Sequence, residues 1–81
     1  MMVERAFVLI NTHDQIDNNM VLTQLRKIEG ISEAYKVSGI YNILVKVEAE
    51  TMDKAGKVVN YKLKNLKYVQ STLTMVAIKN N

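Results

Sequence analysis

Few residues of this chain combine the type and spacing that chemistry requires. The only histidine, His13, is followed by Asp14, and a neighbouring carboxylate could orient an imidazole for general base catalysis. The two residues lie in a polar stretch, however, with no serine or cysteine nucleophile arranged around them. We therefore expect an exposed loop at this point. The chain also lacks cysteine and any metal or phosphate-loop pattern, so we predict no cofactor and no enzymatic activity.

A second group of polar residues has the character of a binding site. A glycine in a turn lets a ligand approach the backbone, and Tyr41 and Asn42 place hydrogen-bonding groups close to Gly39. Thr72 and Thr74 alternate along a β-prone segment, so both hydroxyls lie on one face. From the residues alone, a plain turn and two good strand formers explain the same pattern.

The periodicity of apolar residues predicts the elements that position these groups. In chain order they are a strand at 5–12, a helix from about 20 to 30, strands at 31–38 and 41–48, a helix at 51–64 and a strand at 68–79. Gly39-Ile40 fits a two-residue type II′ turn between the two middle strands. This β-α-β-β-α-β order predicts a ferredoxin-like α+β fold, with two helices on one face of a four-stranded antiparallel sheet.

Polar residues and glycines mark the expected ends of the helices. Asp17, Asn18 and Asn19 are candidate N-caps of the first helix, and Gly30 is placed to end it. Thr51 is the expected N-cap of the second helix.

The apolar content exceeds what one small domain can cover. The chain has 81 residues, 48% of them hydrophobic, and we predict a single domain over 1–81. In the first strand Ala6, Val8 and Ile10 alternate with Phe7 and Leu9, so both faces of the sheet are apolar. Two helices cover only one face, and a large apolar patch marks a partner surface. We therefore predict self-association through the sheet.

The charge pattern argues against two other classes of partner. The net charge of +3 comes from 11 basic and 8 acidic residues, and the lysines form no dense block. Those gathered in the predicted second helix fit a solvated face, so we expect no direct contact with nucleic acid. No stretch approaches the roughly 20 apolar residues that cross a bilayer, and the N-terminus lacks a signal-peptide core. We expect a cytoplasmic protein without membrane contact.

Several segments together resemble one known family. The run Val37-Ser38-Gly39-Ile40-Tyr41-Asn42-Ile43-Leu44-Val45-Lys46-Val47 is similar to the Val-(Thr/Ser)-Gly-x-(Tyr/Phe)-Asp stretch of the Lrp/AsnC regulators, in their ligand-binding RAM domain. The segments AFVLINT, QLRKIEGI followed by Glu33-Ala34-Tyr35, and Ser71-Thr72-Leu73-Thr74-Met75 also agree with that domain. The resemblance extends from about Arg5 to Ile78.

This resemblance implies a fold, an assembly and a site. RAM domains are ferredoxin-like, dimerise through their sheets as a dimeric α+β barrel, and often form a ring of four dimers. Amino acids or related metabolites bind between the dimers. Carried over by position, the ligand-binding residues are Gly39, Tyr41, Asn42, Thr72 and Thr74.

The chain departs from the family pattern at two points. Asn42 stands where the family has aspartate, so it lacks the negative charge best suited to an α-ammonium group. The first strand also begins within the first five residues, where full-length members carry a helix-turn-helix DNA-binding domain. We therefore expect a stand-alone RAM domain that acts by association with full-length Lrp/AsnC regulators.

Two other interpretations fit the same element order. One is a small dimeric α/β-barrel enzyme of the monooxygenase or isomerase type, for which His13 would be the only candidate base. The other is an ACT-type regulatory domain, whose characteristic glycine lies between the first strand and the first helix. In this chain that loop, NTHDQIDNN, contains no glycine, which favours the RAM interpretation.

Overall fold

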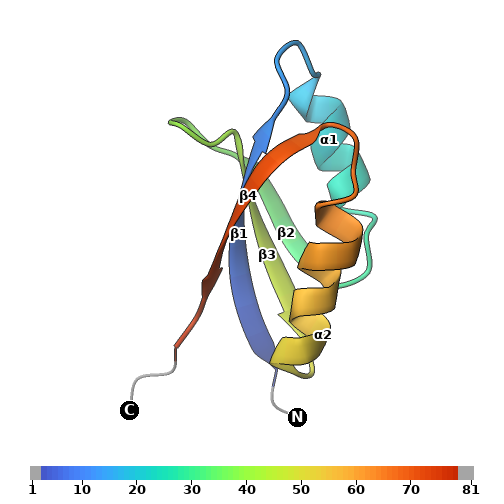
Figure 1. Ribbon diagram of the computed structural model, residues 1–81, viewed down its shortest axis with the longest axis vertical. Helices are drawn as coiled ribbons and strands as arrows, with labels where there is room; N and C mark the ends of the chain where they lie inside the picture. The colour runs from blue at the N-terminus through green and yellow to red at the C-terminus, as the bar shows by residue number, and fades with distance from the viewer. Residues whose placement is uncertain (1–2, 79–81) are drawn as a thin grey trace.

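The computed structural model describes residues 3–78 and has the predicted element order. The elements are β1 (Glu4–Thr12), α1 (Asn18–Leu25), β2 (Ile31–Lys36), β3 (Ile43–Ala49), α2 (Met52–Lys57), its continuation η1 (Val58–Leu63) and β4 (Val69–Val76). The strands form one antiparallel sheet in the order β2-β3-β1-β4. Both helices lie against the same face of this sheet (Figure 1). The ferredoxin-like α+β fold is thus confirmed.

The caps of both helices follow the prediction, but the first helix is shorter. The Asp17 carboxylate accepts from the Asn19 amide at 2.9 Å, and the Thr51 hydroxyl accepts from the Lys54 amide at 3.2 Å. The α-helical part of α1 ends at Leu25, five residues before Gly30, so the predicted end at Gly30 is wrong. A turn follows the helix before β2 begins.

Gly30 serves a different purpose from the predicted helix cap. It has φ of +99°, in the left-handed region that favours glycine. A Cβ atom at this position would lie 2.8 Å from Cγ2 of Val58. The glycine therefore lets the turn before β2 pack directly on the second helix.

The second helix changes its winding midway. Its first part, α2, is α-helical, whereas η1 is a π-helix, in which the Lys64 amide donates to the Val59 carbonyl at 3.0 Å. This wider turn buries Val58, Val59 and Leu63 against the sheet. The predicted extent of this helix was right, but a π-helix was not anticipated from the apolar spacing.

The hairpin between β2 and β3 differs from the prediction. The Val37 amide donates to the Asn42 carbonyl at 2.9 Å, so residues 38–41 form the loop and the predicted two-residue turn is wrong. Asn42 cannot return the second bond of a tight hairpin, because its own amide donates to Ile10 in β1 at 3.0 Å. Gly39 has φ of +140°, a conformation that other residues rarely adopt.

The two faces of the sheet have different surroundings. The helix-covered face carries the core, which comprises Ala6, Val8, Ile10, Val21, Leu22, Leu25, Ala34, Ile43, Val45, Val47, Ala55, Val58, Val59 and Leu63. On the opposite face, which we call the open face, Leu9 pairs with Leu44 and Leu73, and Leu44 also pairs with Tyr35. An apolar row thus crosses all four strands without a covering element. Within residues 3–78, no helix is long and apolar enough to traverse a bilayer.

β4 ends before the predicted boundary. Its last residue is Val76, and Ala77 and Ile78 continue without strand structure. The predicted end at Lys79 lies outside the described residues.

Candidate functional site

A polar cleft lies where the C-terminal end of β1 meets the starts of β3, β4 and α1. It has a volume of about 240 Å³. Its lining residues are Asn11, Thr12, His13, Asp14, Gln15, Ile16, Asn18, Asn42 and Gln70. All but one of these side chains are polar, and the cleft adjoins an irregularity in the β1–β4 pairing at Asn11/Thr12. Irregularities of this kind often redirect side chains beside functional sites.

Thr12 and Asn42 form the centre of this cleft. The Oδ1 atom of Asn42 accepts from the Thr12 backbone amide at 2.9 Å and lies 3.2 Å from the Thr12 hydroxyl. That hydroxyl also lies 3.1 Å from Oδ1 of Asn18. Thr12 is only 6% exposed, although it is polar. The Asn42 side chain therefore takes the place of a strand carbonyl and extends the β1–β3 pairing past its last main-chain pair.

His13 and Asp14 lie in the exposed β1–α1 loop, as the sequence predicted. The His13 backbone amide donates to the Tyr68 carbonyl at 3.1 Å, which ties the loop to the start of β4. In the same loop Gln15 has φ of +69°, an uncommon conformation for a residue other than glycine. The side chains of His13 and Asp14 line the cleft, and no serine or cysteine is among its lining residues.

The five predicted ligand-binding residues do not share one cavity in a single chain. Gly39 and Tyr41 belong to the β2–β3 loop, which projects away from the helices (Figure 1). Asn42 lines the polar cleft. Thr72 pairs with Ile10 and Thr74 with Val8, on the helix side of β4. Their side chains line two further hollows along that edge.

All five residues nevertheless surround the same half of β1. Asn42 bonds to Ile10 and Thr12 on one side of this strand, and Thr72 pairs with Ile10 on the other. Since adjacent strands lie about 4.8 Å apart, roughly 10 Å of sheet separates these two groups. Their common role in binding stays a prediction.

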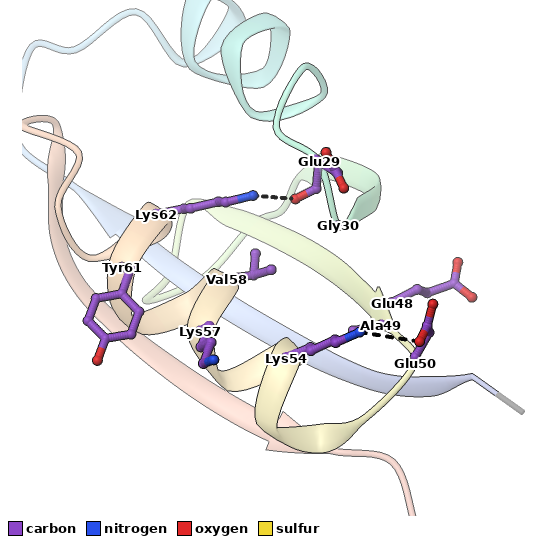
Figure 2. Close-up of a pocket in the computed structure, with 10 residues that line it drawn as sticks. All are labelled: Glu29, Gly30, Glu48, Ala49, Glu50, Lys54, Lys57, Val58, Tyr61 and Lys62. Atoms are coloured by element: carbon purple, nitrogen blue, oxygen red, sulfur yellow. Dashed lines mark hydrogen bonds and ion pairs between the residues drawn. The ribbon is translucent and has the colours of Figure 1, made fainter.

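A larger hollow, about 450 Å³, lies elsewhere and contains none of the predicted residues. Figure 2 shows it between the second helix, the end of β3 and the turn at Gly30. Three lysines line it, at positions 54, 57 and 62, and three glutamates, at positions 29, 48 and 50. We favour the smaller cleft as the site, because there the buried polar residue Thr12 is hydrogen-bonded to Asn42, a predicted ligand-binding residue.

The charges of this larger groove are partly satisfied within the protein. Lys54 pairs with Glu50 at 3.3 Å, and Nζ of Lys62 donates to the Glu29 carbonyl at 3.2 Å (Figure 2). Glu48 pairs outside the groove with Arg5 at 3.3 Å. A polyanion would meet the interspersed glutamates, so this surface does not resemble a nucleic-acid groove. Among residues 3–78, no three acidic or histidine side chains gather as metal ligands.

Thr12, Asn18 and Gln70 line the cleft but were not predicted from the sequence as site residues. Thr12 did carry a signal, because it continues the buried alternation of Ala6, Val8 and Ile10 as a polar residue. A polar side chain at a core position requires a hydrogen-bond partner. Asn18 and Gln70 carried no comparable signal, since only the tertiary fold brings them to the end of β1.

The sequence and fold match known proteins along almost the entire chain. The family model described as "Lrp/AsnC ligand binding domain" matches residues 5–80. An uncharacterised HTH-type transcriptional regulator of Pyrococcus furiosus is 39% identical over 74 residues, which make up 89% of this chain and 49% of that protein. A solved hypothetical protein from Pyrococcus horikoshii is 33% identical with a TM-score of 0.84, covering 98% of this chain and 93% of that one.

Two further matches show how widely this segment occurs. Homocitrate synthase of Sulfurisphaera tokodaii is 31% identical over 74 residues, which make up 91% of this chain but only 16% of the enzyme. A transcriptional regulator of Neisseria meningitidis, solved as a complex with L-Met, shares the fold at 17% identity and a TM-score of 0.82. That match covers 94% of this chain and 50% of the regulator.

The chain therefore spans about half the length of the curated regulators that it matches. The match to the family model covers nearly every residue, including all the segments that suggested the resemblance. This chain belongs to the Lrp/AsnC family, as its ligand-binding domain.

Proposed function

We propose that this chain is a regulatory module that binds an amino acid or a related small metabolite and assembles with copies of itself. The observation that carries the proposal is the match of residues 5–80 to a ligand-binding domain. The curated regulators that it matches are HTH-type transcriptional regulators, which agrees with a regulatory role and not a catalytic one.

The geometry supports a ligand site at the end of β1. Asn42 lies in the polar cleft, and Gly39 and Tyr41 extend from it in the projecting loop. Thr72 and Thr74 lie on the far side of β1. Since no single cavity holds the five residues, a pocket completed by a second protomer would bring such dispersed groups onto one ligand.

The open face supports self-association. Its residues Tyr35, Leu73 and Met75 are 45–49% exposed. Tyr35 and Leu73 belong to the apolar row through Leu9 and Leu44, and Met75 lies beside it. An apolar surface of this kind is stabilised when a matching surface excludes water from it. We infer a homodimer in which the two sheets pack face to face. Further contacts between such dimers would form a ring.

The relatives suggest how such a module acts. The matched segment occurs in an HTH-type regulator and in a homocitrate synthase, so it accompanies different partners in longer chains. We propose that the present chain alters the assembly or effector response of full-length Lrp/AsnC regulators. Its organisation as a stand-alone domain stays a prediction, as do the cytoplasmic location and the absence of direct DNA contact.

Native mass spectrometry with a panel of L-amino acids and their oxo-acid counterparts tests the proposal. We expect a dimer or larger even-numbered assembly that retains a small molecule with micromolar to millimolar affinity. Titration calorimetry then gives the affinity and the number of ligands per chain. A monomer that binds no member of the panel would contradict both the sensor and the assembly proposals.

A further inference from the structure

The orientation of the Asn42 amide is fixed by its partner. The atom 2.9 Å from the Thr12 backbone nitrogen must be an acceptor, because a backbone N–H can only donate. Oδ1 therefore points at Thr12, and the choice between oxygen and nitrogen, open for many asparagines, is settled by hydrogen bonding. The two hydrogens of the amide are on Nδ2, so the group that Asn42 can present to a ligand is a hydrogen-bond donor.

The neighbours of Asn42 reinforce this orientation. The Thr12 hydroxyl has one hydrogen and lies near two amide oxygens, at 3.2 Å from Asn42 and 3.1 Å from Asn18. This hydrogen can be donated to either oxygen, so Asn42 Oδ1 can accept from Thr12 through both the backbone amide and the hydroxyl. Thr12 is 6% exposed, so water does not compete effectively for these bonds.

We propose that the polar cleft binds a small organic acid whose 2-position carries a hydrogen-bond acceptor, a carbonyl or hydroxyl oxygen placed at Asn42, and not an ammonium group. Thr12 acts as the positioning residue, because it holds the Asn42 oxygen and thereby directs the nitrogen toward the ligand. The inference rests on the proposed ligand-binding function and specifies the chemical class of the ligand.

The remaining lining of the cleft agrees with this class. Asn11, Asn18 and Gln70 add neutral amides that can donate or accept. The charged or titratable residues of the cleft are Asp14 and His13, and both lie on the exposed loop. An ammonium at Asn42 would face a donor, whereas an oxygen would accept from Nδ2.

The size of the cleft fits a metabolite of this kind. Liquid water occupies about 30 Å³ per molecule, so about 240 Å³ corresponds to about eight waters or one small organic acid. The class comprises 2-oxo and 2-hydroxy acids, whose oxygen replaces the amino group of an amino acid. Their carboxylates remain free to contact the hairpin backbone or a neighbouring protomer.

Matched pairs of ligands test the proposal on the unmodified protein. Titration calorimetry compares L-alanine with pyruvate, and L-leucine with its oxo-acid counterpart. We expect the oxo acid of each pair to bind at least about tenfold more tightly, because an ammonium facing a donor leaves both groups unpaired. Tighter binding of the amino acids would overturn the inference and leave the proposed function standing, whereas binding of neither class would overturn both.

The Asn42→Asp variant gives an independent test. Asp keeps an oxygen for the Thr12 amide, so the fold is maintained, but the other side-chain atom becomes a charged acceptor. We expect at least about tenfold weaker binding of any ligand that presents an oxygen there. Stronger binding, or an unchanged affinity, would show that Asn42 does not meet an acceptor.

Two further variants separate charge from position. Gln24→Glu makes the same amide-to-carboxylate change on the exposed side of α1, away from the cleft, and should leave the affinity unchanged. Thr12→Val removes the hydroxyl but keeps the backbone amide, so Asn42 Oδ1 loses one of its two hydrogen bonds from Thr12. We expect Thr12→Val to reduce the preference for oxo acids over amino acids, whereas Thr12→Ser, which restores a hydroxyl, preserves it. A merely structural role would lower stability in Thr12→Val and leave the preference intact.

Discussion

The two faces of the sheet are built from alternate residues of the same strands, yet they have different tasks. In β1, Ala6, Val8 and Ile10 are at most 2% exposed beneath the helices, while Phe7 and Leu9 between them are only half-buried. Both sets are apolar. The helix-covered face forms the core, and the proposed self-association would account for the apolar character of the other.

The two faces also differ in how their polar side chains are paired. Among residues 3–78, the covered face has one buried polar side chain, Thr12, which is matched by amide partners at the end of β1. On the open face, Glu33 pairs with Lys46 and Arg5 pairs with Glu48, and both pairs retain contact with water. These pairs occupy one side of the apolar row. The contrast predicts that mutations on the covered face alter folding and those on the open face alter association.

The largest effect on folding is expected from Ile10→Ala. Ile10 is fully buried, and removing most of its side chain should lower the free energy of unfolding by about 2–5 kcal/mol. Urea denaturation at several protein concentrations measures this loss, since dimerisation would make stability depend on concentration. Leu9→Ala, the adjacent residue on the open face, is the matched control. An equal loss for both variants at the lowest concentration would contradict the division between the faces.

A smaller effect on folding but a large one on assembly is expected from Leu9→Lys. Leu9 lies at the centre of the apolar row, so a lysine there would place an ammonium in the interface of each protomer. The dissociation constant of the dimer should rise by on the order of 100-fold, while the monomer keeps its fold because the lysine stem can reach water. Sedimentation velocity across a range of concentrations measures the change.

Tyr61→Lys provides the control for this substitution. Tyr61 is 69% exposed on the helix side of the molecule, so the same new charge is introduced away from the open face. We expect its dissociation constant to match that of the unmodified protein. If Tyr61→Lys separates the protomers and Leu9→Lys does not, the interface lies on the helix side.

Much of the fold was accessible from the sequence because local patterns determine it. The alternation of Ala6, Val8 and Ile10 located β1, and the caps Asp17 and Thr51 marked both helix starts. The hairpin could not be predicted correctly, because the Asn42 amide bonds to β1 and so widens the turn. That contact joins segments 32 residues apart, whereas turn rules consider only neighbouring residues.

The candidate site was less accessible for the same reason. The hairpin pattern identified Asn42. Its partner Thr12 lies 30 residues earlier and was predicted neither as a core residue nor as a site residue. The π-helix η1 was similarly hidden, since α-helical and π-helical windings share the same apolar residues over so short a segment. Contacts that the tertiary fold creates are therefore what the structure adds to the sequence.

The smallest effect concerns the polar side of the open face. Nζ of Lys46 lies 2.8 Å from Glu33, and the Tyr35 hydroxyl also donates to this carboxylate. The bond from Lys46, and then that from Tyr35, hold the pKa of Glu33 below its ordinary value. Because the pKa is lowered in the folded state, the stabilisation exists above the unfolded value, near 4.5, and is lost as the pH falls through the folded pKa.

Carboxylate titration by NMR should show Lys46→Gln raising the pKa of Glu33 more than Tyr35→Phe does. The reverse order, or an unperturbed pKa in the parent protein, would mean that these side chains do not meet on the open face.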